Sequence, residues 1–241
     1  MLQTEQGIVL TSVRHNDRTN ILKVYTRTHG TAAFVFHPAQ TARSISRNSL
    51  QQPLTQIEFQ TDYRPNASLL NIKEIRNLNP YRSIVFNPVK SAISLFVAEF
   101  LTHALANESC NSRLYSFLED SLEWFDSTPE KQCANFHIAI MLGTASALGI
   151  SPDIGRYEPG AMLDMREGCF TMQPGHTDFA DVTSSAIIAR FLQYRLEQTK
   201  DVPLNREQRI LVLRTLNSYF RLHIPAFPQL ESVSVLETVF S

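Results

Sequence analysis

The sequence predicts a multidomain α+β chain in which a small β-barrel precedes an all-helical domain carrying a β-hairpin lobe. Short runs of β-branched and aromatic residues recur up to residue 75. After Pro80, apolar residues recur instead at helical spacing. The chain has 241 residues, of which 43% are hydrophobic and 19% charged, a globular composition that can bury a sizeable core. We therefore expect a barrel domain at 1–79 and a helical domain at 80–241.

Five strand candidates lie before this boundary. They are residues 7–10, 21–26, 31–36, 54–59 and 69–75. Thr28-His29-Gly30 separates the second candidate from the third at hairpin distance. Five short strands suit a Greek-key barrel such as the OB-fold, and they also suit an SH3-like barrel. The polar stretch from Pro38 to Gln52 is expected to form a long loop between strands.

Helical signals begin at Asn87-Pro88, an N-cap residue followed by a proline suited to the first helical position. The helix that follows this N-cap is expected over residues 90–107. Further helices are expected over 114–125, from Pro129 to a stop at Gly149, over 184–198, over 205–222 and in a short segment after Leu230. Leu163 to Phe170 predicts a hairpin, which would form the small lobe at about 160–173.

Several classes of protein are excluded by what the sequence lacks. It has no apolar run of membrane-spanning length, and its first residues show neither a basic start nor an apolar stretch typical of a secretory signal. Cys110, Cys133 and Cys169 lie far apart, which favours a reducing cytoplasm. Phosphate-binding, dinucleotide-binding, hydrolase and zinc-site motifs are missing. We expect neither an enzyme nor a cofactor, and a hydrolase assembled from distant side chains is the disfavoured alternative.

Charge is distributed unevenly along the chain. Residues 1–80 hold nine Lys and Arg against five Asp and Glu, a net +4, and the remainder carries −5. A basic first third suggests a module that faces a polyanion, although solvated loops would give the same pattern. The candidate phosphate contacts are Arg14, Arg18, Lys23, Arg27, Arg43 and Arg47. Tyr25 and Tyr63 are the aromatic residues that we expect at the surface for base stacking, and Phe34, Phe36 and Phe59 suit the barrel core.

The helical domain is rich in aromatic residues, which we interpret chiefly as core packing. They are Phe96, Phe100, Phe117, Trp124, Phe125 and Phe136. An alternative is that part of the set lines a groove for a partner peptide. Arg82, Lys90 and Arg113 could frame such a groove and attract an acidic peptide.

Taken in order, these segments resemble the RecO family of bacterial recombination mediators over nearly the whole chain. The barrel signals are Gly7-Ile8-Val9-Leu10, 17–30 with the basic loop at Arg43, 54–59 and 72–75. The helical signals are 90–99, 114–122, 135–137, Leu148-Gly149-Ile150-Ser151-Pro152, 219–225 and 230–236. The resemblance implies an OB-fold for the barrel.

One departure from the family pattern concerns metal. Many members of the family that this chain resembles carry a four-cysteine zinc module after the segment that corresponds to 148–152. Here the stretch from Ser151 to Thr177 holds only Cys169, so we expect a hairpin in place of the zinc lobe and no bound metal.

The resemblance implies a mediator that is not an enzyme and that anneals complementary strands. Its implied partners are single- and double-stranded DNA, RecR, and the acidic C-terminal tail of single-stranded-DNA-binding protein (SSB), with loading of the recombinase RecA as the outcome. We expect a monomer when the protein is free. The alternative from another class is a protein-interaction scaffold whose barrel does not touch nucleic acid.

Overall fold

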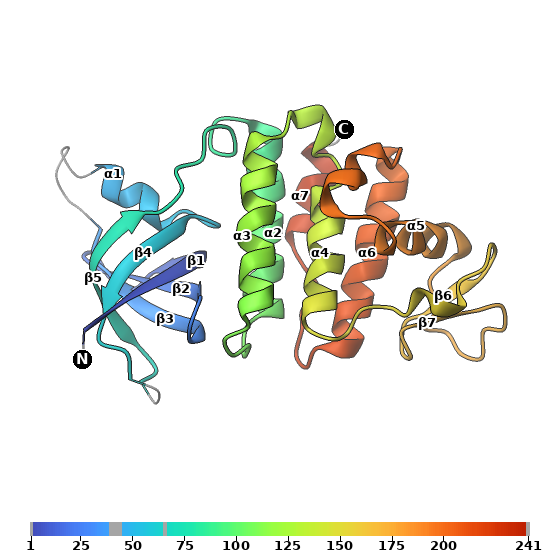
Figure 1. Ribbon diagram of the computed structural model, residues 1–241, viewed down its shortest axis with the longest axis horizontal. Coiled ribbons are helices and arrows are strands. Elements are labelled where there is room, and N and C mark those ends of the chain that lie inside the picture. The colour runs from blue at the N-terminus through green and yellow to red at the C-terminus, as the bar shows by residue number, and fades with distance from the viewer. Residues whose placement is uncertain (1, 39–44, 65–66, 240–241) are drawn as a thin grey trace. The chain divides into compact units, whose positions relative to one another are not determined.

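The computed structural model describes residues 2–38, 45–64 and 67–239 (Figure 1). The chain forms two compact units, one of residues 1–82 with 98–122 and one of residues 83–97 with 123–241. A barrel dominates the first unit and a helical core the second. The expected division of the chain into domains at residues 79 and 80 stays a prediction. In the part of the chain that the structure describes, no helix has the length and apolar character needed to cross a membrane.

The first unit contains a closed five-stranded barrel, the expected OB-fold. Its strands are β1 (Gln3–Arg14), β2 (Asn20–Thr26), β3 (Gly30–Phe36), β4 (Gln56–Thr61) and β5 (Leu70–Asn77). They follow the order β1-β2-β3-β5-β4, and β4 pairs back onto β1 to close the barrel. The β3–β5 pairing is parallel, and the other four are antiparallel. All five strand predictions are confirmed, with β1 longer than the apolar run at 7–10 indicated.

The stretch expected as a loop between β3 and β4 is partly helical. Its described part holds α1 (Ile45–Asn48) and a 3-10 turn, η2 (Ser49–Gln51). Leu50 lies in the barrel core, which gives this segment an apolar anchor. The sequence did not reveal the helix because it is one turn long and has no extended apolar period.

Alternation along the strands builds the barrel core. Inward positions of β2 and β3 are Leu22, Val24, Phe34 and Phe36, each fully buried. Phe34 packs edge-on against Phe59, with ring centroids 4.9 Å apart. The expectation that Phe34, Phe36 and Phe59 belong to the core is confirmed.

Residues 98–122 complete the first unit. They comprise the end of α2 (Pro88–Ala104), a connection and most of α3 (Ser112–Ser127). The connection lies against the β2–β3 turn, where Gly30 has a positive φ of 74°. A Cβ atom at Gly30 would overlap the carbonyl oxygen of Glu108 and the backbone of Ser109. Glycine at this position therefore permits both the turn and the close approach.

The described part of the second unit contains four further helices and several 3-10 turns, together with the start of α2, the end of α3 and a small hairpin (Figure 1). The helices are α4 (Phe136–Ala147), α5 (Val182–Leu192), α6 (Arg206–His223) and α7 (Ser232–Val239). The 3-10 turns are η3 (Glu130–Gln132), η4 (Ile154–Arg156) and η5 (Leu196–Asp201). The expected helix start at Pro129 is wrong: only a 3-10 turn forms there, and α4 begins at Phe136. Likewise, the helix expected over 184–198 ends at Leu192, before η5.

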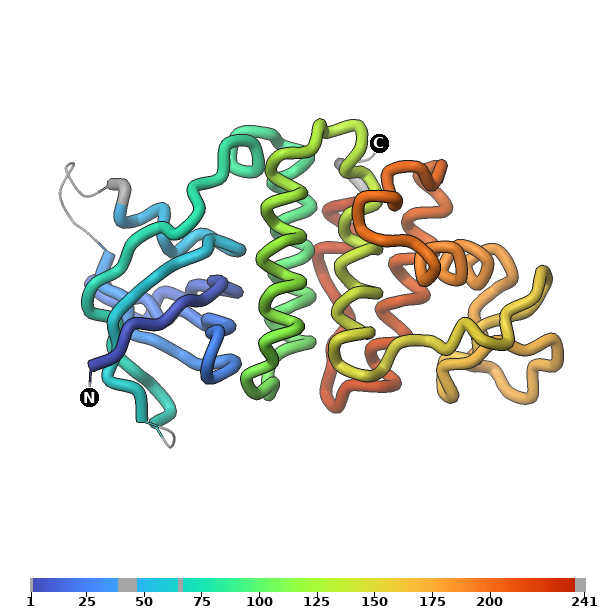
Figure 2. The backbone as a smooth tube through the Cα atoms, in the orientation of Figure 1, coloured from blue at the N-terminus to red at the C-terminus, as the bar shows by residue number. Residues whose placement is uncertain are grey.

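The expected hairpin lobe is present in the second unit, as the tube in Figure 2 shows between η4 and α5. Its strands are β6 (Met162–Asp164) and β7 (Cys169–Thr171). Single backbone bridges join Asp164 to Phe179 and Cys169 to Asp153, so both edges of the small sheet have a neighbour. The Tyr219 hydroxyl donates to the Ile150 carbonyl at 2.8 Å and links α6 to the segment that enters the lobe.

Candidate nucleic-acid interface

The tip between β1 and β2 presents two of the six predicted phosphate contacts, Arg14 and Arg18. The backbone N–H groups of His15 and Asn16 both donate to the Thr19 carbonyl, which holds the turn closed. The Asn16 side chain accepts from the Arg18 N–H at 2.9 Å. Arg18 therefore lies in an exposed turn that these hydrogen bonds hold in shape.

Arg14 pairs with Asp17 at the same tip. The two side chains approach to 2.6 Å, but they are 73% and 93% exposed. An ion pair so open to water contributes little, about 0–1 kcal/mol. A phosphate group could therefore replace Asp17 as the partner of Arg14 at little cost.

A third predicted contact, Arg47, lies at the same end of the barrel. Its guanidinium stands 5.6 Å from the centroid of the Phe36 ring, in cation–π geometry. Phe36 pairs with Asn20 across β2 and β3, and Asn20 pairs with Arg14 across β1 and β2. The Asn20 amide also donates to Gln51, next to α1. Strand register and these contacts thus bring Arg14, Arg18 and Arg47 to one end of the barrel, which we name the basic tip.

Lys23 and Arg27 lie away from the basic tip, against residues 98–122. The Lys23 ammonium donates to the Thr102 carbonyl at 3.2 Å, and burial lowers its pKa from the ordinary value. Arg27 lies 3.7 Å from the Glu119 carboxylate and 5.2 Å from the centroid of the Tyr115 ring. Both cations therefore take part in packing the helices on the barrel. Arg43 lies outside the described residues.

The same helices cover part of the outer face of β2 and β3. In OB-folds this face, with the loops beside it, commonly binds oligonucleotides. Here the Thr31 hydroxyl donates to the Leu105 carbonyl at 2.6 Å. Tyr25 is fully buried and its hydroxyl donates to the Asn111 carbonyl at 3.4 Å. The covered part of the face is closed to a ligand, whereas the basic tip is not.

The expectation that Tyr25 is a surface residue for stacking is wrong. Burial beneath the helices raises the pKa of its hydroxyl to about 12. The polar hydroxyl of Tyr25 suggested that the side chain is exposed, but this hydroxyl donates to a backbone carbonyl of a distant segment. Tyr63 is half-buried and stacks on His29, with centroids 3.5 Å apart and planes 6° from parallel.

The three residues expected around a partner-peptide groove differ in exposure. Arg82 and Arg113 are exposed, but Lys90 is 2% exposed. Its ammonium donates to Ser83 Oγ at 2.6 Å and to the carbonyls of Phe125, Asp126 and Thr128. The expectation that Lys90 lines an open groove is corrected by this burial: the lysine satisfies carbonyls at the end of α3. The groove itself stays a prediction.

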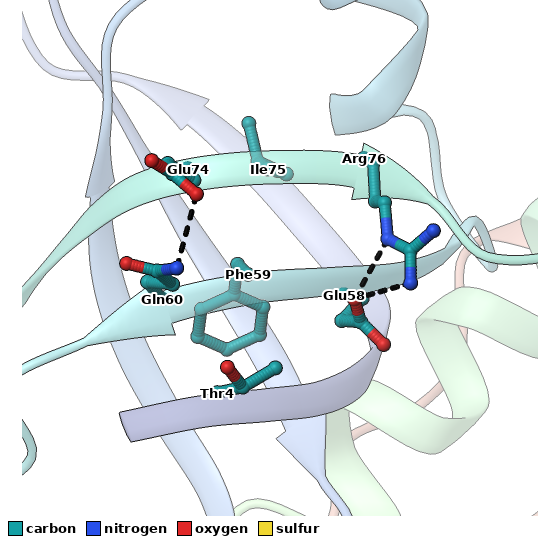
Figure 3. Close-up of a pocket in the computed structure, with 7 residues that line it drawn as sticks. All are labelled: Thr4, Glu58, Phe59, Gln60, Glu74, Ile75 and Arg76. Carbon is teal, nitrogen blue, oxygen red and sulfur yellow. Dashed lines mark hydrogen bonds and ion pairs between the residues drawn. The ribbon is translucent and has the colours of Figure 1, made fainter. Parts of the chain in front are cut away.

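A pocket that the sequence did not indicate lies on the outer face of β1, β4 and β5 (Figure 3). Within it, Arg76 pairs with Glu58 at 2.6 Å, and Gln60 donates to Glu74 at 3.0 Å. Two carboxylates against one guanidinium leave the lining net negative, which disfavours a phosphate ligand. Glu58 and Arg76 occupy paired positions on β4 and β5. The sequence did not predict this ion pair, because the register of the two strands cannot be read from the sequence alone.

Metal-ligating side chains are not gathered at any point in residues 2–38, 45–64 and 67–239, where no three His, Cys, Asp or Glu residues form a group suited to a metal ion. Cys169 stands in the hairpin lobe without a second cysteine in the stretch 151–177. These residues do not fit a four-cysteine zinc site. The absence of bound zinc stays a prediction.

Comparison with known proteins gives matches over both parts of the chain. Residues 1–81 match the family model described as recombination protein O N terminal, and residues 85–231 match recombination protein O C terminal. The chain is 36% identical to DNA repair protein RecO of Phocaeicola vulgatus over 242 residues, with both sequences fully covered. It is 37% identical to the protein of that name from Bacteroides fragilis (strain YCH46) and 29% identical to the one from Porphyromonas gingivalis, also at full coverage.

Proposed function

This chain belongs to the recombination protein O (RecO) family of DNA repair proteins, and from that premise we propose that it is a DNA-binding recombination mediator. In this proposal the protein binds single- and double-stranded DNA, anneals complementary strands and, with RecR, helps load RecA onto SSB-coated single strands. It works in the cytoplasm and catalyses no change of covalent bonds.

The observation that carries the proposal is the basic tip. Arg14, Arg18 and Arg47 lie at this end of the barrel, and Asp17, the acid that pairs with Arg14, is itself open to water. Guanidinium groups bind phosphate oxygens directly and release counterions from the polymer. Such binding is independent of sequence, as a mediator that coats or anneals arbitrary strands requires.

Residues 98–122 support a DNA site at the basic tip, because they cover part of the β2–β3 face, which is the alternative site. Tyr25 and Thr31 are in contact with residues 98–122, so a strand cannot lie along that part of the β2–β3 face without displacing the helices. We infer that DNA crosses the end of the barrel. Arg43 belongs to the proposed interface by its place in the chain, between β3 and α1.

A fluorescence-anisotropy titration with labelled single-stranded and double-stranded oligonucleotides tests the proposal. Wild-type protein is expected to bind both, and an Arg43→Glu/Arg47→Glu variant is expected to bind both more weakly. Wild-type protein that binds neither oligonucleotide at low salt would favour the alternative, a protein-interaction scaffold.

Partner contacts have their own test. A labelled peptide with the sequence of an SSB tail is expected to bind the wild-type protein, and an Arg82→Glu/Arg113→Glu variant is expected to bind it more weakly. Unchanged affinity in that variant removes these two arginines from the proposed groove.

A further inference from the structure

The end of the barrel that carries the basic tip has polar side chains on its inner face. Alternation along β2 directs Leu22 into the core, so Asn20, two residues earlier, lies on the same face of the strand. Ser12 of β1 is the direct cross-strand partner of Leu22 and shares that face. Ser12 and Asn20 therefore lie at the edge of the core, next to Arg14, which pairs with Asn20 across the two strands.

The segment formed by α1 and η2 packs against this end of the barrel. The Arg47 guanidinium lies over the ring of Phe36, which belongs to the barrel core. Leu50, three residues further along the chain, is buried in the same core. Because Arg47 is the cation that this segment contributes to the basic tip, the way the segment packs decides where that cation lies.

The Oε1 atom of Gln51 accepts two hydrogen bonds from the barrel. The Ser12 hydroxyl donates to it at 3.1 Å, and the Asn20 side-chain amide donates to it as well. Ser12 lies on β1 and Asn20 on β2, which are the two strands joined by the exposed turn of the basic tip. One side-chain oxygen thus links both of these strands to the segment that carries Arg47.

The short helix α1 does not fix the position of Arg47 by itself. It is one turn long (Ile45–Asn48), and a single helical turn fixes several dihedral angles for very few hydrogen bonds. Its position therefore depends on the contacts of the residues that follow it, among which Gln51 is bonded to two strands. A guanidinium that is held in place before binding loses less conformational entropy when it meets a phosphate.

The far end of the segment, where it joins β4, has separate anchors. The Leu54 N–H donates to the Val9 carbonyl at 2.7 Å, and the Tyr81 hydroxyl donates to the Leu54 carbonyl at 2.7 Å. Leu54 is fully buried with a positive φ of 63°, a conformation that a leucine keeps only when its surroundings fix it. Loss of the Gln51 hydrogen bonds therefore releases the end of the segment near the basic tip and leaves its junction with β4 in place.

Resting on the proposed function, we propose that Gln51 is a positioning residue for DNA binding. Its amide oxygen holds Arg47 beside Arg14 and Arg18, so that the three guanidinium groups meet one stretch of sugar-phosphate backbone together. Gln51 carries no charge, and it acts through Arg47.

A Gln51→Met variant tests this role, because methionine keeps the length of the side chain and removes the acceptor oxygen. Its affinity for a labelled single strand is expected to fall roughly five-fold, since part of one charge-assisted contact is lost. The same substitution in an Arg47→Ala background is expected to change affinity by less than about two-fold, because the two residues act together. A general loss of stability would instead lower affinity by the same factor in both backgrounds.

The matched control is Gln52→Met, which removes the same amide from the next residue, where the side chain is exposed. This variant should bind DNA as wild-type protein does. A Ser12→Ala/Asn20→Ala variant removes both donors and keeps Gln51, and it is expected to show the same loss as Gln51→Met. It decides the question if Gln51→Met does not fold, which circular dichroism of each variant establishes.

Two results would overturn the positioning role. One is wild-type affinity in both the Gln51→Met and the Ser12→Ala/Asn20→Ala variants, and the other is an equal loss with and without Arg47. Wild-type protein that binds no single strand at low salt would instead overturn the proposed function, so the two failures are distinguishable.

Discussion

The ammonium nitrogen of Lys90 lies 2.6 Å from the carbonyl oxygen of Thr128. Thr128 follows the last residue of α3, and the last carbonyls of a helix have no partner within it. The carbonyls of Phe125 and Asp126 and the Ser83 hydroxyl also surround this ammonium, which leaves it closed to water. Asp126 in turn accepts the N–H groups of Ser83 and Ile84. Lys90 and Asp126 therefore close the end of α3 as one hydrogen-bonded unit.

Replacement of Lys90 by methionine keeps the apolar stem and removes the ammonium. We expect the free energy of unfolding to fall by about 2–4 kcal/mol, because buried carbonyls lose a charged donor. Urea denaturation measures it. Lys131→Met, at an exposed lysine three residues after Thr128, is the control and should change the midpoint little. A Lys90→Met midpoint equal to that of wild type would contradict the structural role.

Alanine substitutions at Gly30 and Gly149 distinguish the cost of backbone strain from the cost of steric overlap. Both have positive φ, 74° and 75°, but a Cβ atom at Gly149 meets nothing within 4 Å. Gly149→Ala is therefore expected to lower the free energy of unfolding by about 1–2 kcal/mol through backbone strain alone. Gly30→Ala adds the overlap with Glu108 and Ser109 and should be clearly more destabilising. Equal effects of the two variants in urea denaturation would show that the β2–β3 turn is not held against residues 108 and 109.

His137 makes stability depend on pH. It is fully buried in α4, and burial, followed by the charge of Arg209, lowers its pKa to about 3. An unfolded chain binds a proton at this histidine near its ordinary pKa of about 6.5. The stabilisation that depends on a neutral His137 is therefore complete when the pH lies above the unfolded-state pKa, and it is lost as the pH falls towards 3. His137→Leu should flatten the fall in thermal midpoint between these values, and His15→Asn, at an exposed histidine, should not. Identical profiles for wild type and His137→Leu would refute the assignment.

Metal analysis tests the interpretation of the hairpin lobe. Of the cysteines, the lobe holds Cys169 alone. Cys133, which lies outside the lobe, is fully buried, its thiol donates to the carbonyls of Phe125 and Thr128, and burial raises its pKa to about 11. A thiol in that state is a poor zinc ligand, because zinc binds the thiolate. Purified protein is expected to contain less than stoichiometric zinc, and a chelator should leave its thermal midpoint unchanged. One zinc per chain would overturn this expectation.

Local sequence signals were sufficient for the elements that have strong periodicity or caps. Short runs of β-branched and aromatic residues predicted the five strands, and Asn87 caps α2 as expected, with its side chain accepting the Lys90 N–H at 2.9 Å. The fold class followed from these elements because five short strands close only a few kinds of barrel. α4 was misplaced since Pro129 is a valid helix opening, yet the chain there forms only a 3-10 turn.

Local sequence signals did not show which polar side chains are buried. Tyr25 and Lys90 look like surface residues in the sequence, but segments more than thirty residues away supply their hydrogen-bond acceptors. For this reason, only part of the candidate site could be predicted from the sequence. Arg14 and Arg18 lie in a polar, exposed loop, whereas the position of Lys23 and Arg27 depends on how residues 98–122 pack on the barrel.

The salt dependence of DNA binding tests the central claim, that the basic tip binds phosphates electrostatically. Two variants remove the same charge from the barrel, Arg14→Ala/Arg18→Ala at the tip and Arg64→Ala/Arg76→Ala elsewhere. Arg64 and Arg76 are exposed and paired with Asp62 and Glu58, so they form a fair control. The slope of log affinity against log salt for a single strand should become shallower by about 1.4 in the tip variant, because two phosphates are no longer neutralised. The control should keep the wild-type slope, and equal slopes in the two variants would contradict the account.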